Sequence, residues 1–177
     1  LPTSGIELSH TGDGIEMAFE AGADNEGLGN LLLCGPCFAG GFGAFHLAIE
    51  PDTVWVNKEG KRFIEEGLGC SPFEAPNAML RQPEQVCFSI FDEAIIQRVI
   101  KHGYIRPDAD TVSPVDKLEN VIKESLDKGT LISSPSITGL AEKTGIDRDA
   151  LKATLEGYNR FCDAGRDNDF SKRPEYL

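Results

Sequence analysis

Four consecutive residues near the start of the chain, Thr11-Gly12-Asp13-Gly14, have the composition of an anion-binding turn. Glycines at the start of a helix let backbone N–H groups approach an acceptor closely, and the helix dipole favours negative charge there. An ordinary helix start has the same composition, because Thr11 or Asp13 can cap the first N–H groups. The tetrapeptide by itself therefore leaves two interpretations open, a ligand-binding turn and a plain helix start.

Thiols are the second group of side chains that could do chemistry. Cys34-Gly35-Pro36-Cys37 matches the C-x-x-C pattern of redox dithiols, in which the first thiol needs the N-terminus of a helix to lower its pKa. The residues that follow, 38–43, are rich in glycine and form helices poorly. There is no second C-x-x-C pair for a zinc site. The five cysteines, odd in number and irregular in spacing, predict reduced, mostly structural thiols, with a thiol-redox role as an alternative.

Two further patterns suggest ligand sites but have the wrong spacing. Gly40-Gly41-Phe42-Gly43 does not complete the G-x-G-x-x-G dinucleotide fingerprint, because His46 occupies the third glycine position. Asp163, Asp167 and Asp169 are spaced like part of a calcium loop, but its twelfth position is proline rather than glutamate. We therefore expect no complete nucleotide-binding domain and no metal site, and we interpret residues 163–174 as a solvated acidic loop.

The charge and the length of the apolar runs exclude two classes of partner. Acidic residues outnumber basic ones by 29 to 17, which gives a formal net charge of −12. Such a surface repels phosphate backbones, so nucleic acid is not expected to bind. The longest apolar run, Leu31-Leu32-Leu33-Cys34, is far shorter than the ~18 residues of a membrane-spanning helix, so no membrane insertion is expected.

The pattern of apolar residues predicts short strands mixed with helices. The expected strands are 31–34, a hairpin of 53–57 and 62–64, 86–91 and 131–132. The expected helices are 10–23, 93–101 capped by Asp92, 115–126 ending near Gly129, 137–141 closed by Gly145, and a long helix capped by Asp147 with a core stripe of Leu151, Leu155, Tyr158 and Cys162. Strands and helices do not alternate regularly. The predicted fold class is therefore α+β, a small mixed sheet with helices.

Four blocks of the chain resemble, in order, segments of one enzyme family. Residues 10–23 resemble a T-G-D-G-I-x-M-A helix, and residues 54–66 resemble a V-N-x-x-G-x-R-F-x-x-E hairpin. Ser89-Ile90-Phe91-Asp92 resembles a strand ending in F-D, and residues 138–170 resemble the helical end of the same domain. The chain is thus similar to the substrate-capping domain of the FAD-dependent fumarate reductase/succinate dehydrogenase flavoproteins, a family that also includes flavocytochromes c, urocanate reductases and 3-ketosteroid dehydrogenases.

The resemblance implies an architecture, a cofactor and partners. Residues 1–27 would be the last helix of an FAD-binding domain, and residues 28–177 would be the cap over the flavin. Thr11, Gly12, Asp13 and Gly14 would be the FAD contacts within this chain, and the partners would be the FAD-binding domain of the same polypeptide and a small organic substrate. In such enzymes hydride passes between the flavin and a C–C bond of the substrate. The isolated chain is expected to be inactive, to retain no FAD and to self-associate weakly through uncovered apolar surface.

The chain departs from the fumarate reductase pattern at two places. Those enzymes carry a proton-donating arginine four residues after the glutamate of the hairpin motif, and counting from Glu66 gives Cys70. They also carry a substrate-binding histidine in an H-P-T sequence, where this chain has residues 32–36 without histidine. A dicarboxylate needs cationic partners in a dry pocket, so we expect the substrate not to be fumarate. The substrate-facing candidates are Cys70, His46 and Arg81, although a single histidine near apolar residues is more often structural.

Other functions remain open at this stage. The chain could be a free-standing binding or interaction module that keeps the cap fold without flavin chemistry, or a thiol-redox protein. Reduced thiols favour a cytoplasmic location. Leu1 is not an initiator methionine, so we expect the natural polypeptide to begin earlier, and export stays open.

Overall fold

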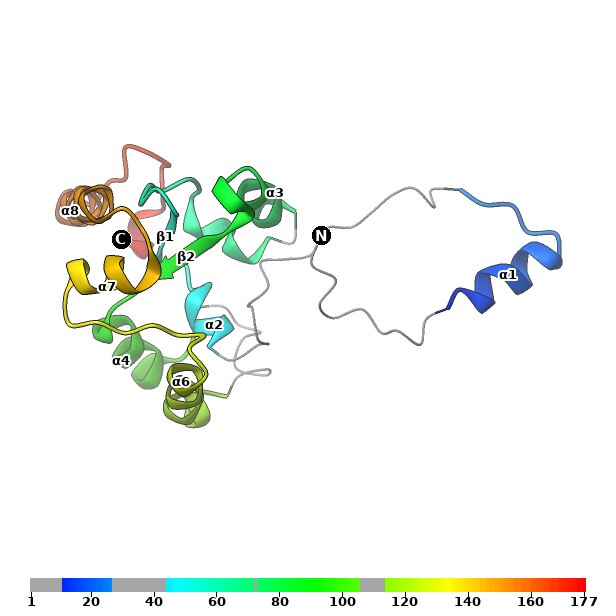
Figure 1. The fold of residues 1–177 in the computed structure, drawn as a ribbon, viewed down its shortest axis with the longest axis horizontal. Helices are drawn as coiled ribbons and strands as arrows, with labels where there is room; N and C mark the ends of the chain where they lie inside the picture. Colours follow the sequence, from blue (N-terminus) through cyan, green and yellow to red (C-terminus); the bar gives the residue numbers. More distant parts are fainter. Residues whose placement is uncertain (1–10, 27–43, 72, 106–113) are drawn as a thin grey trace. The chain divides into compact units, whose positions relative to one another are not determined.

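The computed structural model describes residues 11–26, 44–71, 73–105 and 114–177 (Figure 1). The chain divides into two compact units, Leu1–Leu32 and Leu33–Leu177. The domain boundary expected between residues 27 and 28 stays a prediction. The C-x-x-C pair, the expected strand 31–34 and the glycine-rich segment 40–43 lie outside the described residues.

The first unit contains helix α1, Asp13–Glu20, which is shorter than the predicted helix 10–23. Gly12 begins it in a left-handed conformation with φ 91°, and the Gly12 carbonyl accepts the N–H groups of Ile15 and Glu16 at 2.8 and 3.1 Å. No side chain caps the helix. The prediction of a Thr11 or Asp13 cap is wrong, because the Thr11 hydroxyl donates to the Asp13 carboxylate at 2.7 Å instead.

The second unit is built around a two-stranded antiparallel sheet. Strand β1, Val54–Asn57, pairs with β2, Cys87–Ile90, with Val54 opposite Ile90 and Asn57 opposite Cys87. The predicted hairpin partner 62–64 is reduced to one bridge between Val56 and Arg62. A full strand does not form there because the Glu66 side chain, rather than a backbone carbonyl, accepts the N–H of Trp55 at 3.2 Å.

Helices surround this sheet and confirm the α+β class. The α-helices of the second unit are α2 Phe45–Ala48, α3 Glu74–Leu80, α4 Glu93–His102, α6 Leu118–Asp127, α7 Ile137–Thr144 and α8 Arg148–Ala164. The 3-10 helices are η1 Glu66–Cys70, η2 Pro83–Gln85, η3 Val115–Lys117 and η4 Pro174–Tyr176. No described helix combines the length and apolarity that crossing a membrane requires.

Most helix ends lie where the local sequence predicts them. Asp92 caps α4 through the Ile95 N–H, and Asp147 caps α8 through the Ala150 N–H at 2.8 Å. Gly145 closes α7 in a left-handed conformation. The strand predicted at 131–132 is wrong: the Thr130 and Leu131 N–H groups both donate to the Ser125 carbonyl at 3.0 Å and finish the end of α6.

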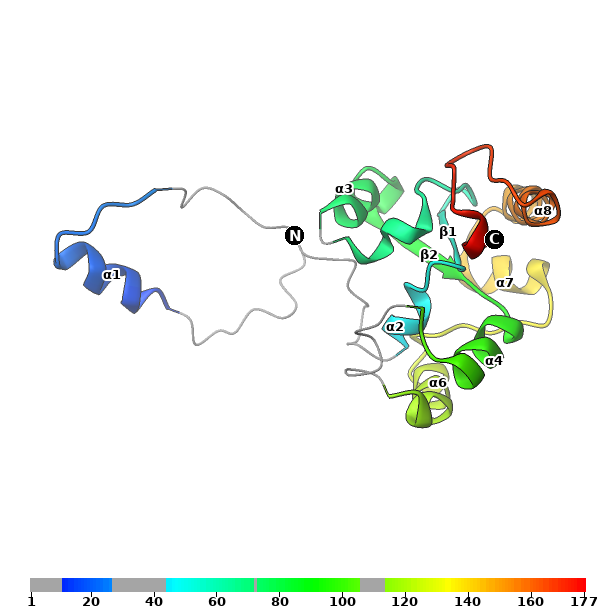
Figure 2. The same ribbon diagram turned by 180° about the vertical axis from the view of Figure 1, so that it is seen from behind.

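Successive residues of β1 supply two separate parts of the core, as the alternation of side chains along a strand requires. Val54 and Val56 pack with α7 and α8, where Leu151 and Tyr158 are buried and Leu155 and Cys162 pack against them. This confirms the predicted stripe of α8. Trp55, on the opposite face, packs with Ile49, Ile64 and Ala75. Accordingly, α7 and α8 lie on one side of the sheet and α3 on the other in both views (Figures 1 and 2). A third cluster joins Leu47, Val99 and Leu118.

Candidate functional site

The turn after β1 is held tightly against helix α8. Gly60 has a φ of 73°, a left-handed conformation that favours glycine. A Cβ at this position would lie 2.6 Å from the backbone nitrogen of Leu151. The Thr154 hydroxyl donates to the Gly60 carbonyl at 2.6 Å. The turn is therefore fixed to the first turns of α8, and it delivers Arg62 into the interior.

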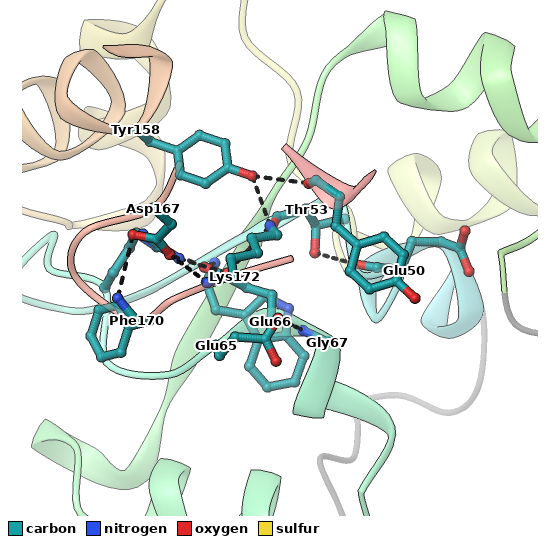
Figure 3. Close-up of polar contacts among 12 residues, drawn as sticks. Glu50, Thr53, Glu65, Glu66, Gly67, Tyr158, Asp167, Phe170 and Lys172 are labelled. Atoms are coloured by element: carbon teal, nitrogen blue, oxygen red, sulfur yellow. Dashed lines mark hydrogen bonds and ion pairs between the residues drawn. The ribbon is translucent and has the colours of Figure 1, made fainter. Parts of the chain in front are cut away.

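Four charged side chains meet beneath this turn, and we call them the buried charge network: Arg62, Glu66, Asp167 and Lys172. Figure 3 labels Glu66, Asp167 and Lys172. The Arg62 guanidinium donates to both oxygens of Glu66 at 2.9 and 2.8 Å, and to both oxygens of Asp167 at 3.2 and 2.9 Å. Lys172 lies 3.3 Å from Glu66. Exposure of the four side chains is 4% or less, so two cations and two anions balance one another away from water.

The remaining polar atoms of the network are also satisfied. The Lys172 ammonium donates to the Thr53 carbonyl at 2.8 Å and to the Tyr158 hydroxyl at 2.7 Å (Figure 3). The Asp167 carboxylate accepts the N–H groups of Asp169, Phe170 and Lys172 itself. Such complete pairing is what makes buried charge tolerable.

Burial and pairing set the proton affinities of the network in opposite directions. Burial alone would raise the pKa of Asp167, but hydrogen bonds from Arg62 and the backbone N–H groups of Asp169 and Phe170 lower it to about 2. Burial also lowers the pKa of Lys172, although the nearby Glu66 carboxylate acts the other way. Burial opposes the charge of Arg62, yet its hydrogen bonds to Glu66 and Asp167 raise its pKa. The arginine and Asp167 thus stay ionised at neutral pH.

This network corrects the interpretation of residues 163–174 as a solvated acidic loop at two positions, whereas most of the segment is exposed as predicted. Asp167 and Lys172 are only 3% and 2% exposed. Asp167 and Lys172 enter the interior because their carboxylate and ammonium balance the charges of Glu66 and Arg62. Arg62 and Asp167 are 105 residues apart in the sequence. The sequence signal for half of the network was present in the R-F-x-x-E spacing, but nothing local pointed to Asp167 or Lys172.

Glu66 also begins η1, the 3-10 turn that ends at Cys70. The Glu65 carboxylate accepts the Gly67 N–H at 2.9 Å and caps the turn. Gly69 lies under the Trp55 ring, where a Cβ would be 2.9 Å from the nearest ring atom. The network at one end and the tryptophan in the middle therefore fix the backbone that carries position 70.

The other substrate-facing candidates lie on separate elements. His46 is a buried residue of α2, with its ring edge-on to Phe45 and Tyr104 at centroid distances of 5.4 and 6.3 Å. Arg81 is the exposed C-cap of α3. Only the backbone of Cys70 is described. These three residues remain candidates, carried by α2, η1 and the end of α3.

A second ion-paired cluster fixes the segment that follows His46. Arg98 of α4 donates to Glu50 at 2.8 Å and to Asp52 at 2.7 Å, and the Ile105 N–H donates to Glu50 at 2.8 Å. Burial raises the pKa of Glu50, against the opposing effect of these hydrogen bonds. The cluster ties α4 to the stretch between α2 and β1, so the position of α2 is set by paired charges as well as by packing.

The start of α1 fits hydrogen-bond acceptors of a cofactor such as FAD. No side chain caps this helix, and a Cβ at Gly12 or Gly14 would meet nothing within 4 Å. Its first turn thus presents N–H groups with open space beside them. Asp13 and Glu16 lie in the same turn, and their negative charge disfavours a phosphate there. The turn therefore offers backbone N–H donors with two carboxylates beside them.

Comparison with known proteins identifies the family. A family model described as FAD binding domain matches residues 2–176. The chain belongs to this family. Vinyl phenol reductase from Lactiplantibacillus plantarum is 29% identical to this chain. The alignment covers 94% of this chain and 36% of the reductase. NADH:acrylate oxidoreductase from Vibrio harveyi is 32% identical over 91% of the chain and 14% of its own length. The chain thus spans about a third or less of these relatives.

Solved structures agree with the family assignment. The open conformation of a flavocytochrome c3 fumarate reductase superposes with a TM-score of 0.61 at 27% identity, covering 92% of this chain and 25% of that one. A solution structure of a fumarate reductase flavoprotein subunit from Lactobacillus plantarum gives a TM-score of 0.54 at 27% identity, covering 76% of this chain and 79% of that one. The two coverages in the second case are similar, so a chain of similar extent holds a related fold in solution.

Proposed function

We propose that residues 28–177 are the substrate-capping domain of an FAD-dependent reductase that acts on a C–C double bond of a small organic substrate other than fumarate. In this proposal residues 1–27 belong to the FAD-binding domain, and the rest of that domain lies elsewhere in the same polypeptide. The observation that carries the proposal is the family match across residues 2–176, together with the blocks that resemble the cap.

The chemistry at position 70 supports a substrate other than a dicarboxylate. From Gly67 to Leu80 the sequence has no lysine, arginine or histidine. A dianion in a dry pocket needs charge-assisted hydrogen bonds from such residues to offset its desolvation. The thiol of Cys70 cannot supply a fixed positive charge. Arg81 could do so only from the end of α3, where it is exposed.

The roles of this chain in the reaction follow from what its residues can hold. FAD, when bound, supplies hydride exchange between its flavin ring and a substrate carbon. Thr11, Gly12, Asp13 and Gly14 would offer hydrogen bonds to the cofactor at the start of α1. The buried charge network would hold η1 in place so that the cap presents Cys70 at a constant position. The closed cap would exclude water from the reacting groups.

FAD retention tests whether most of the cofactor contacts lie outside residues 1–177. The chain of residues 1–177 should elute from gel filtration without flavin absorbance after incubation with excess FAD, because most of the cofactor contacts would lie outside it. The full-length polypeptide, treated in the same way, should elute yellow. Stoichiometric flavin on the short chain would overturn the assignment as a cap. A full-length polypeptide that retains no flavin would overturn the proposed flavin chemistry.

A further inference from the structure

A groove of about 470 Å³ lies between helix α8, the turn after β1 and the loop after α8. Its described lining comes from all three segments and consists of Lys61, Arg62, Ala153, Thr154, Gly157, Arg160, Phe161, Asp169 and Phe170. A volume of this order is typical of sites for small molecules. His46 and Arg81, two of the substrate-facing candidates, are not among these described residues.

The walls of the groove are held by contacts within the fold. The Thr154 hydroxyl donates to the Gly60 carbonyl at 2.6 Å, which joins α8 to the turn. The Arg62 guanidinium lies over the Phe170 ring, 5.0 Å from its centre, and the Phe170 N–H donates to Asp167 at 3.3 Å. The groove is therefore formed before any ligand arrives, which reduces the entropy cost of binding.

Gly157, in the interior of α8, lines the groove without a packing reason to be glycine. Glycine inside a helix is less favourable than any residue except proline. Apart from its own helix backbone, a Cβ at this position would meet only the Arg160 guanidinium, at 3.6 Å. At Gly60, by contrast, the backbone of Leu151 leaves no room for a side chain. The glycine at position 157 thus keeps the groove open beside Arg160.

Two opposite charges face the groove without a partner in the described part of the chain. Neither the exposed Arg160 side chain nor the exposed Asp169 carboxylate makes an ion pair or a hydrogen bond there, and they do not pair with each other. Lys61 also lines the groove, but its ammonium pairs with Glu59 at 3.0 Å. A ligand that carries a single charge would satisfy one of the two unpaired groups and leave the other unpaired.

We propose that this groove binds a zwitterionic α-amino acid with an apolar or aromatic side chain. The ligand carboxylate would accept a pair of hydrogen bonds from the Arg160 guanidinium, and its ammonium would pair with Asp169. Its side chain would cover the half-buried rings of Phe161 and Phe170, which removes apolar surface from water. The described lining belongs to the second unit and needs no FAD, so this inference goes beyond the proposed function.

Titration of the chain of residues 1–177, followed by calorimetry and by amide chemical shifts, tests the choice of ligand. L-Phenylalanine should bind at least tenfold more tightly than 3-phenylpropionate, which lacks the ammonium, and than 2-phenylethylamine, which lacks the carboxylate. The free amino acid glycine, which lacks the apolar side chain, should also bind at least tenfold more weakly.

Four variants test the position of the site. Arg160→Gln and Asp169→Asn should each weaken L-phenylalanine binding at least tenfold. Gly157→Leu should abolish binding without lowering the unfolding temperature, because leucine favours a helix and the position has open space. Arg166→Gln is the matched control, since Arg166 is an exposed arginine outside the described lining, and it should bind like the wild type.

Three results would overturn the proposal. One is the absence of binding by both L-phenylalanine and L-leucine at ~10 mM. Another is equal affinity for L-phenylalanine and 3-phenylpropionate, which would show recognition of an anion alone. The third is wild-type affinity in Arg160→Gln, Asp169→Asn and Gly157→Leu, which would put the ligand elsewhere. None of these results concerns FAD retention, so this inference and the proposed function can fail independently.

Discussion

The Glu66→Gln variant should lose about 3–5 kcal/mol of unfolding free energy, because it removes one partner of a buried charge network and leaves the opposite charges buried. The glutamine would leave the buried network with two cations, Arg62 and Lys172, and one carboxylate, that of Asp167, which pairs with Arg62. It would also weaken the acceptor for the Trp55 N–H on β1. The loss can be measured by urea unfolding of the chain of residues 1–177, followed by circular dichroism and by the fluorescence of Trp55, the single tryptophan.

Glu124→Gln is the matched control for this change. Glu124 pairs with Lys128 at 3.3 Å on the surface of α6, and the two side chains are 69% and 65% exposed. Exposed pairs of this kind contribute about 0.5 kcal/mol or less, so the control should unfold close to the wild type. Equal unfolding midpoints for Glu66→Gln and Glu124→Gln would show that the network does not hold its charges as described.

The Gly60→Ala variant should lose about 3 kcal/mol through two effects that act together. A left-handed alanine costs about 1–2 kcal/mol by itself. The added Cβ would also lie 2.6 Å from the backbone nitrogen of Leu151, and relief by movement of α8 costs about 1–3 kcal/mol. The movement should weaken the Thr154–Gly60 hydrogen bond as well. Thermal and urea unfolding of the variant measure the total.

Gly129→Ala separates the two effects. Gly129 has a φ of 69°, close to the 73° of Gly60, but a Cβ there would meet nothing within 4 Å. This control should therefore lose only the backbone contribution of about 1–2 kcal/mol. If the two alanine variants are equally stable, the close approach of the turn to α8 has no energetic weight, and the account of the turn is wrong.

Local signals explain which parts of the fold could be predicted from the sequence. Asp92 and Asp147 cap helices through N–H groups three residues away, so their role depends only on neighbouring residues. The buried stripe of α8 follows from spacing along one helix. The β1–β2 pairing joins strands separated by η1, α3 and η2, and the nearer segment 62–64 has an equally good strand composition. Sequence reasoning therefore chose the local hairpin and missed the main partner.

The candidate site was harder to predict, because its residues come from segments that are far apart in the sequence. Cys70 could be singled out because the family resemblance supplies a position to count from, Glu66. Asp167 and Lys172 could not, since a charged residue in a polar stretch gives no sign that it will be buried against Arg62 and Glu66.

Fumarate turnover by the full-length enzyme is the most direct test of the central claim. The enzyme, loaded with FAD and supplied with a reduced dye, should leave the dye reduced when fumarate is the acceptor. This result is expected because the segment from Gly67 to Leu80 offers no cation for a dicarboxylate. Dye oxidation by fumarate would contradict the account, because a dianion would then be bound without the counter-charges that its desolvation requires.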